Sequence, residues 1–125
     1  MTFVDSSVWI AYFYKEDSQH AQAERVFRTL TRPLLLHEYV IGEVCTVLNQ
    51  RVSKLQADAF IEYVMGNRDI RIIPSNAEFF LETLSFFRKQ RRRSLSFIDV
   101  ALLYLSKQSS VVTFDRTLAR AFRQE

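Results

Sequence analysis

One segment, residues 94–116, limits the possible folds of this 125-residue chain more than any other, because it reads as a helix followed almost directly by a buried strand. Ser96 can cap the start of the helix, and Asp99 suits its first turn. After a polar stop, residues 111–114 have the β-branched, apolar character of a parallel strand covered on both faces, and Asp115 ends it. In a parallel sheet, the start of such a helix and the end of the next strand share the edge where open α/β folds bind ligands. We therefore expect both aspartates at that edge.

The rest of the chain repeats this alternation of strands and helices. Further strands are predicted at residues 3–5, 33–36 and 70–73, each followed by two helices. The predicted helices start near Ser6 or Ser7, Ser18, Glu38, Ser53, the capping-box pattern of residues 75–78, Ser96 and Arg116, the last running to Glu125. Strands that alternate with helices require a parallel sheet covered on both faces. We therefore predict a single domain, residues 1–125, with a three-layer α/β/α fold around a parallel sheet of four or five strands.

Several classes of protein are disfavoured by what the sequence lacks. It has no glycine-rich phosphate loop, no Cys/His set with zinc spacing and no serine nucleophile elbow. No apolar run reaches membrane-spanning length, and the first residues do not resemble a signal peptide, so no membrane association is expected. The single cysteine, Cys45, stands among valines and leucines, which predicts a buried, inert thiol and a reducing cytoplasm. His20 has no second ligand nearby and is predicted to lie on the surface.

Four acidic residues are predicted to meet at the carboxyl edge of the sheet. Asp5 ends the first strand, and Glu43 lies about one turn into the helix after the second strand, so both join Asp99 and Asp115. Each acid alone could be a helix cap or a solvated helix residue. Crowded carboxylates raise one another's pKa, at a cost of about 1.4 kcal/mol per unit, and a divalent cation removes that penalty. Oxygen ligands favour Mg²⁺ or Mn²⁺, which can activate a water towards a phosphodiester.

The distribution of charge points to a polyanionic ligand. The chain has 17 basic and 14 acidic residues, so without the four acids of the predicted site 17 basic residues face only 10 acidic ones. Five basic residues stand just before the central helix: Arg88, Lys89, Arg91, Arg92 and Arg93. They exceed what a helix end needs, so we expect them to contact RNA phosphates without reading sequence. A solvated helix end, or a contact with an acidic protein segment, remains the alternative.

Four short motifs resemble those of the PIN-domain family in order and approximate spacing. They lie at residues 3–7, 43–44, 95–101 and 112–116. The resemblance covers essentially the whole chain, and at this length the chain is similar to the VapC-type toxins of prokaryotic toxin–antitoxin pairs. It implies that Asp5, Glu43, Asp99 and Asp115 form an acidic site for Mg²⁺ or Mn²⁺. It also implies that Ser6 or Thr113 supports this site by a hydrogen bond to a ligand or water.

The activity implied by this resemblance is metal-dependent endonucleolytic cleavage of RNA in the cytoplasm, by a homodimer that a cognate antitoxin inhibits. A homodimer also fits the surplus of aromatic residues, among them Trp9, Tyr12, Phe86 and Phe87. The chain departs from the family pattern at Gly42, where relatives often have Asn, at Leu118, where Phe is common, and at residues 109–110, which replace a glycine. None of these departures alters the four acids.

Three alternative functions remain open. The first is a housekeeping PIN nuclease in RNA processing. The second is a non-catalytic module that binds RNA or protein, which would be expected to have lost one of the acids, although all four are present. The third is a flavodoxin-like phosphoacceptor domain, which normally has a lysine after the last strand, where this chain has Asp115 and Arg116. His37 and Glu38, at the end of the second strand, are weaker candidates for groups that support the site.

Overall fold

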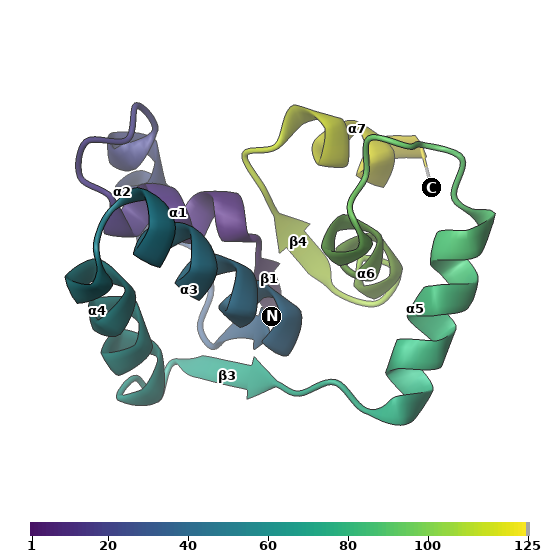
Figure 1. Cartoon of the computed structure of the whole chain (residues 1–125), viewed down its shortest axis with the longest axis horizontal. Coiled ribbons are helices and arrows are strands. Elements are labelled where there is room, and N and C mark those ends of the chain that lie inside the picture. The colour runs from purple at the N-terminus through teal and green to yellow at the C-terminus, as the bar shows by residue number, and fades with distance from the viewer. Residues whose placement is uncertain (125) are drawn as a thin grey trace.

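In the computed structural model of this chain, residues 1–124 are described, and they form a parallel sheet between two layers of helices (Figure 1). The strands are β1 (Thr2–Val4), β2 (Leu34–His37), β3 (Ile70–Ile73) and β4 (Ser110–Val112). The helices are α1 (Ser6–Phe13), α2 (His20–Thr29), α3 (Glu38–Arg51), α4 (Lys54–Met65), α5 (Ala77–Lys89), α6 (Phe97–Leu105) and α7 (Arg116–Gln124). The order of elements and the three-layer fold match the prediction, with a sheet of four strands. The predicted end of the last helix at Glu125 lies outside the described residues.

The sheet has the order β3-β2-β1-β4, and every neighbouring pair is parallel. β1 is therefore paired on both sides, with Phe3 opposite Leu35 in β2 and Val111 in β4. Because β1 and β4 are parallel neighbours in register, the residues that follow them leave the sheet side by side. The backbone N–H of Asp5 donates to the carbonyl of Val112, 3.0 Å away, and this bond fixes the two strand ends against each other.

The core lies where α1 packs between the sheet and the neighbouring helices α2, α3 and α4. Trp9 is fully buried, and its ring lies 4.8 Å from that of Phe27 and 5.6 Å from that of Phe60, centroid to centroid. Tyr12 also packs on Phe27, at 4.6 Å. The aromatic side chains of α1 are thus packing residues, because their rings are occupied by one another rather than offered to a ligand.

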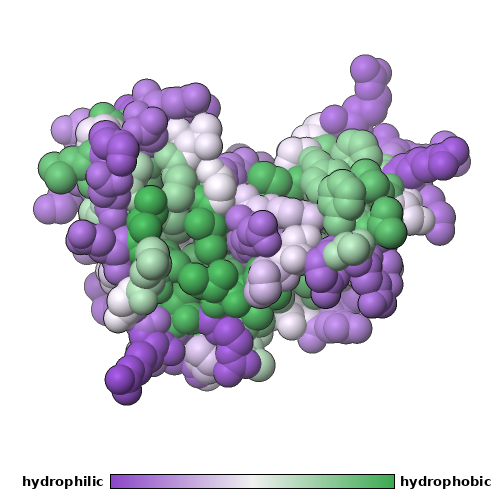
Figure 2. Space-filling model, turned by 60° about the horizontal axis from the view of Figure 1, so that its bottom comes forward, coloured by the Kyte–Doolittle hydropathy of each residue, from purple (hydrophilic) through white to green (hydrophobic). Residues whose placement is uncertain are grey.

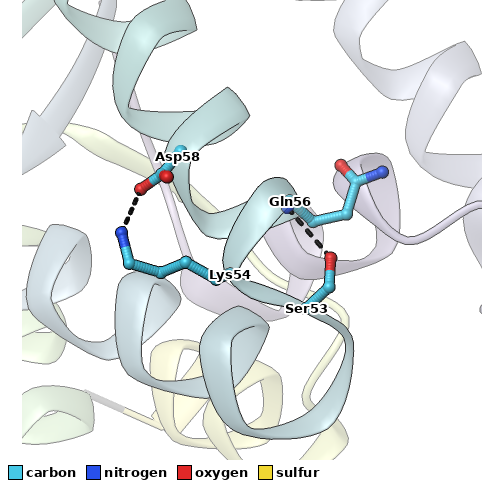
Figure 3. Close-up of polar contacts among 4 residues, drawn as sticks. All are labelled: Ser53, Lys54, Gln56 and Asp58. Carbon is cyan, nitrogen blue, oxygen red and sulfur yellow. Dashed lines mark hydrogen bonds and ion pairs between the residues drawn. The ribbon is translucent and has the colours of Figure 1, made fainter.

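The start of α4 illustrates how local sequence sets the helix boundaries (Figure 3). The hydroxyl of Ser53 accepts a hydrogen bond from the backbone N–H of Gln56 at 3.1 Å, as the predicted cap requires. One turn in, Lys54 and Asp58 form an exposed i,i+4 ion pair at 2.6 Å. Such a pair contributes only about 0.3–0.5 kcal/mol, so the cap is the stronger determinant of where the helix begins.

Two predicted helix caps were wrong. α2 begins at His20, with Gln19 rather than Ser18 at the cap position and no side-chain cap, while the carboxylate of Asp17 accepts from the backbone N–H of Gln19 in the preceding turn. His20 is half-buried rather than on the surface, and its Nδ1 lies 2.8 Å from the carbonyl of Ala11. The start of α5 is capped by Asn76, whose side chain accepts from the N–H of Phe79, and not by a box of Ser75 and Glu78.

The predicted strands were correct to within one or two residues. β1 and β2 are displaced by one residue, to Thr2–Val4 and Leu34–His37, and β3 is as predicted. β4 ends at Val112, two residues earlier than expected, and the backbone N–H of Phe114 donates to the Ser7 hydroxyl instead of extending the ladder. No helix in residues 1–124 is long and apolar enough to cross a bilayer.

Candidate active site

Asp5 is the buried centre of the candidate site. It occupies the cap position of α1, yet its carboxylate makes no cap hydrogen bond. Instead the side chain, in a residue only 3% exposed, accepts hydrogen bonds from three hydroxyls. These come from Thr113 at 2.6 Å, Ser7 at 2.9 Å and Ser6 at 3.4 Å. A buried carboxylate is tolerated only when hydrogen bonds replace its lost hydration, and the three hydroxyls supply such bonds. The reading of Asp5 as a helix cap is therefore insufficient.

The same hydroxyls hold the chain that leaves β4. The Thr113 hydroxyl accepts from the backbone N–H of Asp115 at 3.0 Å, while the Ser7 hydroxyl accepts from the N–H of Phe114 at 3.0 Å. The Thr113 hydroxyl therefore links the Asp5 carboxylate to the backbone N–H of Asp115, and the Ser7 hydroxyl links it to that of Phe114. Of these hydroxyls, Ser6 and Thr113 were predicted from the sequence as supporting groups and Ser7 was not, although its bond is shorter than that of Ser6. The only signal was a second serine directly after Ser6.

Asp99 enters the site from the first turn of α6. Its carboxylate Oδ2 accepts from the backbone N–H of Ser96 at 3.0 Å, and the Ser96 hydroxyl accepts from the N–H of Asp99 at 3.0 Å. This confirms Ser96 as the cap and Asp99 in the first turn, and the two reciprocal bonds form a capping box. Burial raises the pKa of Asp99, and the negative charges of Asp5 and Asp115 raise it further, while the hydrogen bonds from Ser96 oppose the shift. The three aspartates thus lie close enough to act on one another.

Asp115 is the exposed member of the group. Its Oδ1 accepts from the backbone N–H of Leu118 at 3.0 Å, so the side chain caps α7. Within residues 1–124, the second carboxylate oxygen of Asp115, like Oδ1 of Asp99, accepts no hydrogen bond. Both residues therefore serve as caps and still keep one oxygen for a ligand. Asp99 and Asp115 can therefore be helix caps and ligand-binding groups at the same time.

Glu43 is on α3 and lines a groove that also reaches α6. It lines an open groove of about 700 Å³ together with Phe80, Phe97 and Ile98, the last of these directly before Asp99. In the described part of the chain no hydrogen bond joins Glu43 to the three aspartates. Gly42 lines the same groove, and a Cβ placed there would meet no atom within 4 Å. In the structure Asp99 is thus influenced by the charges of Asp5 and Asp115, and Glu43 lines a groove that also borders Ile98, the residue before Asp99.

The oxygen donors of this site suit a hard divalent cation, although the acidic side chains are not arranged around a common point. Among residues 1–124, no three His, Cys, Asp or Glu side chains are close enough to hold one ion jointly. Mg²⁺ is usually bound through only one or two carboxylates and keeps several waters, and carboxylate and hydroxyl oxygens are the donors that it and Mn²⁺ prefer. Two unused aspartate oxygens beside a buried carboxylate meet that requirement. Metal binding by Asp5, Glu43, Asp99 and Asp115 stays a prediction.

The basic residues predicted to bind RNA span the end of α5 and the turn that follows it. Arg88, Lys89, Arg91 and Arg93 are exposed. Arg92 is half-buried and donates hydrogen bonds to Gln90 at 3.0 Å and to Gln124 at 2.6 Å, which ties the turn to the end of α7. Arg92 therefore shapes the turn. Phosphate contacts by this group remain a prediction.

His37 and Glu38 connect the end of β2 to the start of α5. His37 is 1% exposed, its Nδ1 accepts from the backbone N–H of Tyr39 at 3.1 Å, and burial lowers its pKa. The carboxylate of Glu38 accepts from the N–H of Ser75 at 2.7 Å. Cys45 is half-buried, and burial raises the pKa of its thiol, which disfavours the reactive thiolate. None of these three residues contacts the aspartates in a hydrogen bond within residues 1–124.

The geometry of the strand ends, with an aspartate after β1 and another after β4, agrees with a comparison against known families. The model of the PIN domain matches residues 2–123. The chain belongs to the PIN-domain family. Among curated proteins, this PIN domain is 23% identical over 111 residues to the 23S rRNA-specific endonuclease VapC20 of Mycobacterium tuberculosis, covering 89% of this chain and 84% of that protein.

Solved structures show the same fold. The crystal structure of Mycobacterium tuberculosis VapC20, described as a Sarcin-Ricin loop cleaving toxin, superposes with a TM-score of 0.88 at 22% identity, covering 97% of this chain and 95% of that one. The structure of FitAcB from Neisseria gonorrhoeae superposes with a TM-score of 0.68 at 14% identity, covering 98% of this chain and 94% of that one. At these identities the likeness establishes the three-layer PIN fold.

Proposed function

We propose that this PIN domain is an endoribonuclease, and that it acts as the toxin of a type II toxin–antitoxin pair. The proposal is supported by Asp5 and Asp115, which follow the neighbouring parallel strands β1 and β4, and by Asp99, whose pKa is raised by burial and further by the charges of Asp5 and Asp115. A relative that aligns with 89% of this chain, the 23S rRNA-specific endonuclease VapC20, supports the proposal. A toxin of this kind would act on RNA in the cytoplasm.

In the proposed mechanism, Asp5, Asp99 and Asp115, with Glu43 from the neighbouring groove, would hold Mg²⁺ or Mn²⁺. When bound, the ion would activate a water and offset the charge that develops on the phosphate. The chain itself supplies the orientation. Thr113 and Ser7 fix the carboxylate of Asp5, and the capping box with Ser96 fixes that of Asp99. Phosphates would be contacted by four exposed side chains, those of Arg88, Lys89, Arg91 and Arg93.

The proposed partners are an antitoxin and a second copy of the chain, and exposed apolar side chains on α5 support a protein contact. Four large apolar side chains of this helix are exposed: Phe80, Leu81, Leu84 and Phe87. The surface in Figure 2 carries two apolar areas separated by polar side chains, one of them on the side where Figure 1 places α5 and α6. Exposed apolar patches of this kind mark interaction sites. Sedimentation that shows a monomer at high micromolar concentration would count against the homodimer.

The proposed activity is tested by incubating the purified protein with intact ribosomes and with protein-free ribosomal RNA, in Mg²⁺, Mn²⁺ or EDTA. We expect cleavage that requires the metal and is lost in Asp99→Asn, with the fold of the variant confirmed by circular dichroism. Cleavage that persists in EDTA and in Asp99→Asn would refute the acidic site. Tight RNA binding without cleavage under any of these conditions would instead identify a non-catalytic RNA-binding module.

A further inference from the structure

The charges of this chain divide sharply between its two parts. Residues 1–85 carry eight lysines and arginines and eleven acids, whereas residues 86–124 carry nine lysines and arginines and only two acids. Those two acids are Asp99 and Asp115, both in the candidate site. The C-terminal part is therefore a positively charged body around the aspartates, and the turn of residues 88–93 accounts for only five of its nine cations.

Three of the remaining cations lie on α7, in one row. Arg116, Arg120 and Arg123 are spaced i, i+4 and i+7, which places them on one face of the helix, and all three are exposed. The opposite face carries Leu118 and Ala121, both buried. The helix is thus anchored by its apolar side and presents a continuous row of guanidinium groups to solvent.

In the described part of the chain, this row of arginines forms no ion pair. The ion pairs formed within residues 1–124 lie on α2 and α4, and none involves α7. Like charges at i,i+4 destabilise a helix by about 0.2–0.5 kcal/mol per pair. The helix dipole favours a cation such as Arg123 in the last turn but disfavours Arg116 in the first. Local helix energetics therefore do not account for the row, and an external anion would relieve its repulsion.

The row connects the candidate site to the basic turn. At one end, Arg116 directly follows Asp115, which caps the helix. At the other end, Gln124 accepts the hydrogen bond from Arg92, which holds the turn of residues 88–93 against α7. A helix of nine residues is about 13 Å long, so the arginines span the distance between the aspartates and the turn.

We propose that the arginine face of α7, formed by Arg116, Arg120 and Arg123, binds the phosphate backbone of the RNA substrate and leads the strand from the aspartates to the basic turn. The inference rests on the proposed ribonuclease function. RNA fits this face better than a protein does, because the row contains no aromatic or aliphatic anchor of the kind that dominates protein interfaces. Guanidinium groups match phosphate oxygens in two-pronged hydrogen bonds, and such contacts are not sequence-specific.

The inference is tested by RNA binding without cleavage. The affinity for a labelled single-stranded RNA of mixed sequence is measured in EDTA at several salt concentrations, for the wild type and for the triple variant Arg116→Gln, Arg120→Gln, Arg123→Gln. A matched control, Arg25→Gln, Arg28→Gln, Arg68→Gln, removes the same charge from exposed positions in the acid-rich part of the chain. Each lost phosphate contact lowers the salt slope by about 0.7 for a single strand.

We expect the slope to fall by about two in the α7 variant, with affinity lower by up to about a hundredfold at 0.1 M salt, and the control to remain within about threefold of the wild type. Equal slopes for the two triple variants would overturn the inference. Glutamine is a good helix former, so α7 should persist. If the triple variant nevertheless unfolds, Arg120→Gln alone should lower the slope by about 0.7, and an unchanged slope would refute the proposal.

Cleavage kinetics separate this inference from the proposed function. If the protein is a ribonuclease and α7 binds its substrate, the α7 variant should show a raised KM with kcat retained at saturating RNA. An active enzyme whose KM is unchanged in the α7 variant would overturn the role of α7 and leave the ribonuclease standing. If the protein cleaves no RNA but its α7 variant binds RNA less tightly, the role of α7 in RNA binding would stand and the ribonuclease function would be refuted.

Discussion

Replacing Thr113 by valine removes the shortest hydrogen bond to the buried carboxylate of Asp5 and keeps the shape of the side chain. The Thr113 hydroxyl donates to Asp5 over 2.6 Å and accepts from the N–H of Asp115. A hydrogen bond to a charged group contributes about 1.5–3 kcal/mol, whereas the N–H of the exposed Asp115 can bond to water instead. We therefore expect the free energy of unfolding to fall by about 2 kcal/mol.

The chain contains a matched control on the same pair of strands. Thr2 lies at the opposite end of β1, and its hydroxyl bonds to that of Ser110 in β4 at 2.7 Å, exposed to solvent. Water replaces this bond when it is removed, so Thr2→Val should change the stability by less than about 0.5 kcal/mol. Both variants are compared with the wild type by urea denaturation in EDTA, so that no bound metal adds to the stability.

A double-mutant cycle with Asp5→Asn identifies the interaction responsible. Hydrogen bonds between neutral groups contribute about 1 kcal/mol less than those to a charge, so Thr113→Val should be less costly by about that amount when residue 5 is asparagine. The reasoning is refuted if Thr113→Val and Thr2→Val are equally mild, or if the cost of Thr113→Val is independent of the charge at residue 5. Under the proposed function, Thr113→Val should also reduce RNA cleavage.

Three further outcomes are expected. Gly42→Ala should stabilise the protein by about 0.5–1 kcal/mol in urea denaturation, because an added Cβ meets no atom within 4 Å and glycine is unfavourable inside a helix. A loss of stability would mean that other atoms occupy the groove beside Gly42. Asp99→Asn should raise the thermal midpoint at pH 7, since burial and, further, the charges of Asp5 and Asp115 raise the pKa of this carboxyl, and such a carboxyl favours unfolding once the pH exceeds its unfolded value. A lower midpoint would contradict this destabilisation. His37, whose pKa is lowered by burial, contributes stability that is complete above the unfolded value of about 6.5 and is lost as the pH falls through that value. Urea midpoints between pH 7.5 and 5 should therefore fall less steeply in His37→Asn than in the wild type, and parallel curves would exclude His37 as the cause.

Those features that depend on a few neighbouring residues could be predicted from the sequence. The alternation of apolar strands with helices gives the three layers, because each element must bury its apolar face. The capping box of Ser96 and Asp99 was visible because a cap bonds to backbone groups three residues away, and the same holds for Ser53. Asp5 and Asp115 could be placed at one edge from the parallel topology alone.

Only the tertiary structure decided how these groups share their hydrogen bonds. Ser7 and Thr113 are 106 positions apart, and no local pattern shows that both bond to Asp5. The junction of Arg92 with Gln124, which joins the basic turn to α7, is likewise a contact between distant segments. Local sequence determines which backbone groups a side chain can reach, whereas the packing of whole elements determines which distant side chains it meets.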